Sequence, residues 1–210
     1  GAAIAARFAG ERVHALSSAD LDVTDEAAVT AFFADREVDV LVNNAGVSAS
    51  APLARTTLED WNRQLAVNAT GAFLCTRAVL PGMLERDRGR IVTVASIAGH
   101  VGARYVSAYT ASKHAVLGLV RAVAAEVAGT GVTCNAVCPA YVRTDMTQRT
   151  IANIEARTGK DGEAALAAMS PLGRLVEPEE VAFAVGFFAA EEAGAINGQT
   201  LIIDGGGVQQ

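Results

Sequence analysis

The sequence predicts an α/β fold in which a single doubly wound parallel sheet is flanked by helices. Short apolar runs of strand length alternate along the chain with longer segments of helical periodicity, the pattern of repeated β-α-β units. The chain has 210 residues, of which 51% are hydrophobic and 19% charged, so it can bury a sizeable core. No linker or internal repeat divides it, and we expect residues 1–210 to form one domain.

Four segments have the apolar character of buried strands, and they are residues 38–42, 90–95, 132–137 and 201–203. Between them, helical periodicity covers residues 57–84, 107–128 and 178–190. The last of these helices begins with Pro178 and two glutamates, which is typical of a helix start. Helices and strands therefore alternate as a parallel sheet requires.

The N-terminal region departs from this pattern. Residues 1–8 predict a helix directly after Gly1, whereas a doubly wound sheet normally begins with a strand and a glycine-rich turn. We expect that strand and that turn to be missing from this sequence. A second gap is expected near Gly10, before the strand-like residues 13–16, where on the order of 15–20 residues of a strand and helix would be absent. The alternative is that residues 13–16 are themselves the second strand.

Net charge, hydropathy and the cysteines indicate which partners, metal sites and cellular location to expect. The net charge is −6 with no basic run, so we do not expect nucleic acid as a partner. No apolar stretch reaches the ~20 residues of a membrane span, and residues 1–7 have no signal-peptide pattern. Cys75, Cys134 and Cys138 have neither disulfide nor zinc-site spacing, so we expect free thiols, no metal site and a cytoplasmic location.

Three residues suited to proton transfer are predicted to share one crevice. Tyr109 and Lys113 are four positions apart and therefore lie on one face of the helix predicted at 107–128. A positive charge beside a phenol favours the phenolate and lowers its pKa. Ser96 follows a predicted strand, at the end where ligands bind in open α/β sheets. A Tyr and a Lys at this spacing also occur by chance, usually as a half-buried Tyr and a solvated Lys.

Further motifs stand in order along the chain. Asn43, Asn44, Ala45 and Gly46 follow the first predicted strand directly, and Asn68 lies in the helix after it. Beyond Ser96, Tyr109 and Lys113 come a Cys-Pro-Ala-Tyr-Val-Arg-Thr segment at 138–144, Gly173-Arg174, and an Asp-Gly-Gly at 204–206. From residue 20 onward the chain resembles the short-chain dehydrogenase/reductase family, whose motifs have this order and spacing. Ala140 departs from the family's usual glycine beside the nicotinamide.

The resemblance implies a Rossmann-type fold and NAD(P)-dependent interconversion of a ketone and a secondary alcohol. Ser96 would hydrogen-bond the carbonyl oxygen and Tyr109 would protonate it. Lys113 would lower the Tyr109 pKa and hold the nicotinamide ribose, and Asn68 would hold a water that connects Lys113 to solvent. NAD and NADP are not distinguished. The cofactor contacts implied are Asp22, Val23, Asn43, Ala45, Gly46, Tyr109, Lys113, Pro139, Val142 and Thr144.

The resemblance implies a small-molecule ketone or alcohol as the substrate, with a 3-oxoacyl thioester as the leading hypothesis. Residues 145–172 would form a substrate lid, in which Arg149, Arg157 and Lys160 would either meet coenzyme A phosphates or form a solvated helix face. Thr130 stands where carrier-protein reductases often have an arginine, leaving Arg86 and Arg88 for carrier docking.

Two other functions are compatible with the sequence. One is a dehydrogenase of a small cyclic, sugar or polyol alcohol. The other is a non-catalytic, cofactor-binding scaffold, although such proteins commonly lose the Tyr or the Lys. The resemblance also implies a homotetramer or homodimer, with Trp61 and Phe73 either in the core or at the subunit interface.

Overall fold

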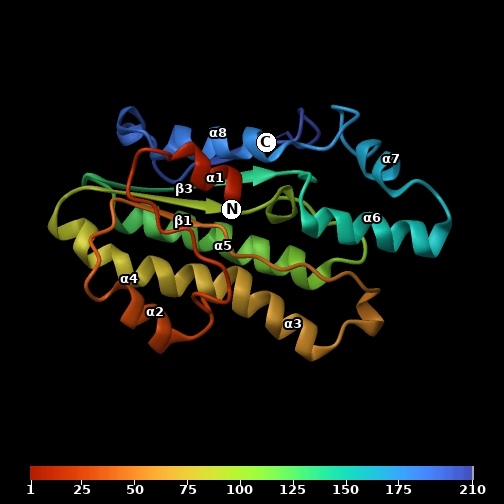
Figure 1. The fold of residues 1–210 in the computed structure, drawn as a ribbon, viewed down its shortest axis with the longest axis horizontal. Coiled ribbons are helices and arrows are strands. Elements are labelled where there is room, and N and C mark those ends of the chain that lie inside the picture. The colour runs from red at the N-terminus through yellow and green to blue at the C-terminus, as the bar shows by residue number, and fades with distance from the viewer. Residues whose placement is uncertain (210) are drawn as a thin grey trace.

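The computed structural model describes residues 1–209, which form a parallel sheet with helices on both faces (Figure 1). Its four strands are β1 (Val40–Asn43), β2 (Gly89–Val94), β3 (Val132–Pro139) and β4 (Thr200–Ile203). They lie in the order β1-β2-β3-β4, and each adjacent pair is parallel. All four predicted strands are confirmed, and their carboxyl ends point to the same edge of the sheet.

Two hydrophobic cores cover the two faces of the sheet. On one face α4 (Gly71–Glu85) and α5 (Ser107–Glu126) pack with Ile91 and Cys134 of the strands. On the other face α8 (Pro178–Ala189) and α1 (Ala2–Arg7) pack against Val92 and Val137. Figure 1 shows α8 and α1 above the strands and α4 and α5 below them. Every residue of β3 is buried, as a central strand covered on both faces requires.

The helix predicted at 57–84 is confirmed, but it is not regular. It consists of α3 (Leu58–Leu65), a π-helical turn (Ala66–Thr70) and α4. The π turn contains Asn68, and such turns are frequent at functional sites. The helices predicted at 107–128, 178–190 and 1–8 correspond to α5, α8 and α1.

The segment before β1 differs from the prediction. Residues 13–16 form no strand in the described chain, and Val13 and Leu16 are exposed. A short run without a partner strand has no ladder of hydrogen bonds to hold it, so the strand alternative is wrong. Instead α2 (Glu26–Phe33) follows, with Asp25 as its N-cap. The expected missing strand, helix and glycine-rich turn stay predictions.

The segment after β3 forms two helices, α6 (Asp145–Thr158) and α7 (Gly162–Ala167). They pack through a small cluster of Ile151, Leu166 and Leu175. Short 3-10 turns complete the chain at Leu53–Arg55, Ile97–Gly99 and Glu191–Ala195. Within residues 1–209, no helix combines the length and the apolarity needed to cross a membrane.

Candidate active site

Ser96 is held where two strands end. It follows the carboxyl end of β2 and caps the 3-10 turn Ile97–Gly99, its Oγ accepting a hydrogen bond of 3.1 Å from the Ala98 N–H. The same Oγ lies 3.5 Å from the carbonyl oxygen of Pro139 at the end of β3, which is a long contact. The hydroxyl is buried, and this weak donation leaves its hydrogen available for a stronger acceptor.

Tyr109 and Lys113 lie one turn apart on α5, as predicted. The Lys113 Nζ is 5.6 Å from the centre of the Tyr109 ring and donates to the Val94 carbonyl at 3.0 Å. Lys113 is buried, and burial lowers its pKa from 10.5 to about 8. Because an ammonium has three donors, this contact leaves two for a ligand.

Burial also raises the pKa of Tyr109, while a hydrogen bond with the Ser96 side chain acts in the opposite direction. The nearby Tyr141 raises it further. The sequence predicted a pKa lowered by Lys113, but the pKa of Tyr109 is raised, because burial of the phenol disfavours the charged phenolate. Tyr109 is therefore protonated at neutral pH, the state needed to donate a proton to a carbonyl oxygen.

Asn68 ties three segments together. Its Oδ1 accepts from the Val47 N–H at 2.8 Å, and its Nδ2 donates to the Val47 carbonyl at 3.0 Å and to Ser112 Oγ at 2.8 Å. Ser112 in turn donates to the Tyr109 carbonyl at 2.7 Å. The Asn68 amide thus joins the loop after β1 to the turn of α5 that carries Tyr109. Its expected water contact stays a prediction.

Ser112 is a site residue that the sequence analysis missed. Its signal is a hydroxyl at a fully buried position on an otherwise apolar helix face, three residues after Tyr109. A buried polar group must find partners, and here the partners are Tyr109 and Asn68.

The predicted cofactor contacts Gly46, Pro139, Val142 and Thr144 lie on segments that follow strand ends. A Cβ on Gly46 would be 3.5 Å from Asn68 Oδ1 and 3.9 Å from Lys113 Nζ, so this backbone passes beside the buried lysine. Ala45 is its neighbour in the loop. Pro139 ends β3, Val142 bridges to Val176, and Thr144 caps α6. Cofactor contact at all five positions stays a prediction.

The side chains of the other three predicted contacts are engaged within the protein. Asn43 is buried and donates to Thr76 Oγ1 at 3.0 Å. Val23 packs against Gly71, where an added Cβ would approach within 2.6 Å. Asp22 is exposed and accepts from the N–H and hydroxyl of Thr24, which lowers its pKa. These residues shape the loops by their side chains, and their contact with a cofactor stays a prediction.

The positive residues predicted to meet the substrate or its carrier differ in their surroundings. Arg86 donates to the Val38 carbonyl and lies 3.5 Å from Glu37, so it fastens α4 to the start of β1. Arg88, Arg149, Arg157 and Lys160 are exposed. No group of three or more metal-ligating side chains occurs among residues 1–209.

Comparisons with known proteins show the family of the chain. The family model described as Enoyl-(Acyl carrier protein) reductase matches residues 2–207. The chain belongs to the short-chain dehydrogenases/reductases. It is therefore an NAD(P)-dependent oxidoreductase that interconverts ketones and alcohols, with a Rossmann-type fold.

Named relatives of this short-chain dehydrogenase/reductase include ketoacyl reductases. It is 46% identical to a ketoacyl reductase assigned to the monensin polyketide synthase of Streptomyces virginiae, over 89% of this chain and 75% of that protein. It is 41% identical to a 3-oxoacyl-[acyl-carrier-protein] reductase of Synechocystis, over 90% of this chain and 72% of that protein. The structure of ElxO with NADP bound matches with a TM-score of 0.83 and 35% identity, covering 91% and 77% of the two chains.

The donors found here fit a nicotinamide cofactor. Lys113 has two unused N–H donors beside the Gly46 backbone, and Gly46 has no side chain to fill the space there. The chemistry of this donor set suits ribose hydroxyls, which accept from an ammonium. The carboxyl edge of the sheet therefore fits NAD or NADP.

Proposed function

We propose that this enzyme reduces 3-oxoacyl thioesters, using Ser96, Tyr109, Lys113 and Asn68. The observation that carries the proposal is the convergence of three side chains at the carboxyl ends of β2 and β3: the Ser96 hydroxyl acts on the pKa of Tyr109, and Lys113 Nζ lies 5.6 Å from the centre of the Tyr109 ring. A carbonyl oxygen placed between these two hydroxyls receives two hydrogen bonds, which strengthen as negative charge develops on it.

Each residue has a separate role in the proposed reaction. When bound, the nicotinamide supplies the hydride. Tyr109 gives its proton to the substrate oxygen, and the positive charge of Lys113 stabilises the phenolate that remains. Ser96 orients the oxygen. Asn68 acts through Val47 and Ser112 as a positioning residue for the turn that carries Tyr109.

The thioester assignment rests on the relatives and on the lid. Both named relatives are ketoacyl reductases, and α6 and α7 provide a long rim beyond the strand ends.

A substrate panel tests this function. Consumption of NADH or NADPH is followed with acetoacetyl-CoA, a cyclic ketone and a keto sugar, with wild-type protein and Tyr109→Phe. We expect acetoacetyl-CoA to have the highest kcat/KM and Tyr109→Phe to lose about 10²- to 10⁴-fold in turnover. Faster reduction of the cyclic ketone or the keto sugar would show that the substrate is not a 3-oxoacyl thioester. No turnover of any ketone would favour the cofactor-binding scaffold.

We also propose a cytoplasmic homotetramer or homodimer. Exposed apolar side chains lie on α4, α8 and β4, where a partner copy would cover them: Phe73, Phe183, Phe187 and Leu201. The three free cysteines suit a reducing compartment. Light scattering after size exclusion, for wild type and Phe183→Glu, tests the assembly. A monomeric mass for wild type would exclude it.

A further inference from the structure

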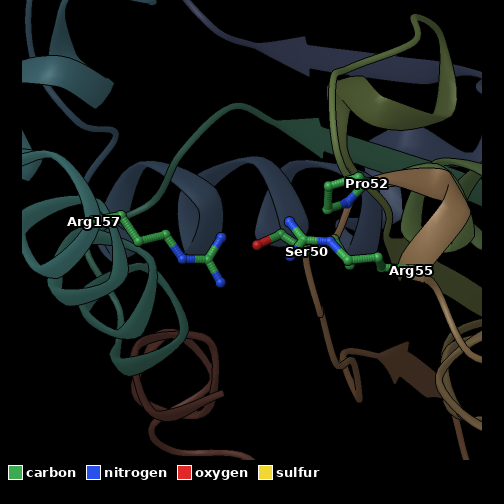
Figure 2. Close-up of a pocket in the computed structure, with 5 residues that line it drawn as sticks. Ser50, Pro52, Arg55 and Arg157 are labelled. Carbon is green, nitrogen blue, oxygen red and sulfur yellow. The ribbon is translucent and has the colours of Figure 1, made fainter.

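A hollow at the rim of the molecule brings together two segments far apart in sequence. It has a volume of about 500 Å³ and is lined by Ser50, Ala51, Pro52, Arg55 and Arg157. Figure 2 shows the Arg157 side chain extending from α6 towards Ser50 and Arg55, which come from the loop after β1. Neither arginine is one of the four proposed catalytic residues, and Arg55 belongs to none of the sequence motifs described above.

The charge of this hollow is uncompensated. Within residues 1–209, neither Arg55 nor Arg157 has an ion pair, although the chain carries a net charge of −6. Four arginines elsewhere in residues 1–209 do form ion pairs with glutamates, namely Arg77, Arg86, Arg143 and Arg174. Two unpaired guanidinium groups on opposite walls form a binding place for an anion, and planar forks of N–H donors suit phosphate oxygens.

Both walls connect directly to the catalytic group. The loop that carries Arg55 begins at Val47, which is bonded to Asn68, and its Ala51 N–H donates to the Tyr105 carbonyl at 2.8 Å, just before α5. The other wall, α6, begins at Asp145, directly after the segment from β3. Arg157 lies twelve positions after Asp145, which is about 18 Å along a helix.

We propose that Arg55 and Arg157 bind a phosphate at the far end of an extended substrate whose ketone lies at Ser96 and Tyr109. The inference rests on the proposed thioester function, and it identifies the substrate as one with an anionic carrier. Such a phosphate belongs either to coenzyme A or to the pantetheine arm of an acyl-carrier protein. Either source presents oxygen acceptors to the two guanidinium groups.

Kinetics with charged and neutral thioesters test the site. Arg55→Gln, Arg157→Gln and the double variant are compared with Arg149→Gln, an exposed arginine of the same helix that does not line the hollow. For acetoacetyl-CoA we expect KM to rise about threefold to tenfold in each single variant and further in the double, with kcat unchanged. For acetoacetyl N-acetylcysteamine, which lacks phosphate, KM should stay constant in all variants.

An acetoacetyl-carrier protein forms the second arm. A rise in KM confined to this substrate supports the site and assigns the phosphate to the carrier, whereas a rise for acetoacetyl-CoA assigns it to coenzyme A. No change with either substrate, or the same change for the neutral thioester, would overturn the proposal. So would an effect of Arg149→Gln equal to that of Arg157→Gln.

Binding of free coenzyme A, measured by calorimetry, separates this inference from the proposed function. If wild type reduces no thioester but binds coenzyme A, and the binding weakens in the double variant, the thioester reaction fails while the anion site stands. If coenzyme A binds equally well to wild type and the double variant, and the carrier arm is also unaffected, the anion site fails even where the thioester is reduced.

Discussion

The proposed catalytic group, Ser96, Asn68, Tyr109 and Lys113, and the proposed substrate lid, residues 145–172, are built in opposite ways. Lys113, Asn68 and Ser96 have exposed fractions of 5%, 3% and 8%, and each is bonded to the main chain of another segment. In α6 only Thr147 and Ile151 are buried, and Met169 after α7 is 67% exposed. Groups that react must be held to a fraction of an ångström, whereas a surface that admits a long substrate can rest on few contacts.

Removal of the Ser96 hydroxyl should have the largest effect. In Ser96→Ala we expect kcat to fall about 10²- to 10³-fold, since a donor to the developing oxyanion is lost, while KM changes little. Steady-state kinetics measure it, and Ser96→Thr, which keeps a hydroxyl, should retain more activity. A fall in kcat of less than tenfold would show that turnover depends on Ser96 no more than on a residue of the lid.

The buried amine of Lys113 should make stability depend on pH. Its folded pKa is about 8 and its ordinary value is 10.5, so between these pH values the unfolded chain holds a proton that the folded chain has lost. The free energy of unfolding of wild type should therefore rise by about 3 kcal/mol relative to Lys113→Met between pH 8 and pH 10.5. Urea unfolding at several pH values measures this difference. If the free energy of unfolding changed with pH in the same way for both proteins, a lowered pKa of Lys113 in the folded chain would be contradicted.

Ser112→Ala probes the support of the catalytic group. It removes a donor to the Tyr109 carbonyl and an acceptor from Asn68, so we expect a loss of about 1–3 kcal/mol in the free energy of unfolding and a lower kcat. Ser107→Ala on the same helix is a matched control, because the Ser107 hydroxyl has no hydrogen-bond partner among the described residues. Equal stability of the two variants would show that the Ser112 bonds contribute nothing.

The smallest effect is expected in the lid. A Cβ at Gly162 would lie 2.6 Å from the Ile151 carbonyl oxygen, so Gly162→Ala should push α7 away from α6 and cost about 1 kcal/mol. KM for acetoacetyl-CoA should rise a few fold while kcat stays the same. Gly118→Ala is the control, since a Cβ there meets nothing within 4 Å. A fall in kcat would show that the lid and the catalytic group are not independent.

Local pattern explains what could be predicted. The four strands and the helices carrying Asn68 and Tyr109 follow from the alternation of apolar runs with helical periodicity, and the Tyr109–Lys113 contact follows from one helical turn. The two differences between the predicted and the observed fold both lie before β1, where the sequence has no clear period. The strand-like residues 13–16 lack a partner, and α2 was not predicted because its short helix lies in a region without a clear period.

By itself, the sequence determined the alternation of elements, the family and the residue types available for proton transfer, because each depends on spacing along the chain. Only the tertiary structure decided the direction of the Tyr109 pKa, the Asn68–Ser112 bridge and the facing of Arg55 by Arg157. Burial, hydrogen bonds and the approach of two like charges arise between segments distant in sequence, and no local period encodes them.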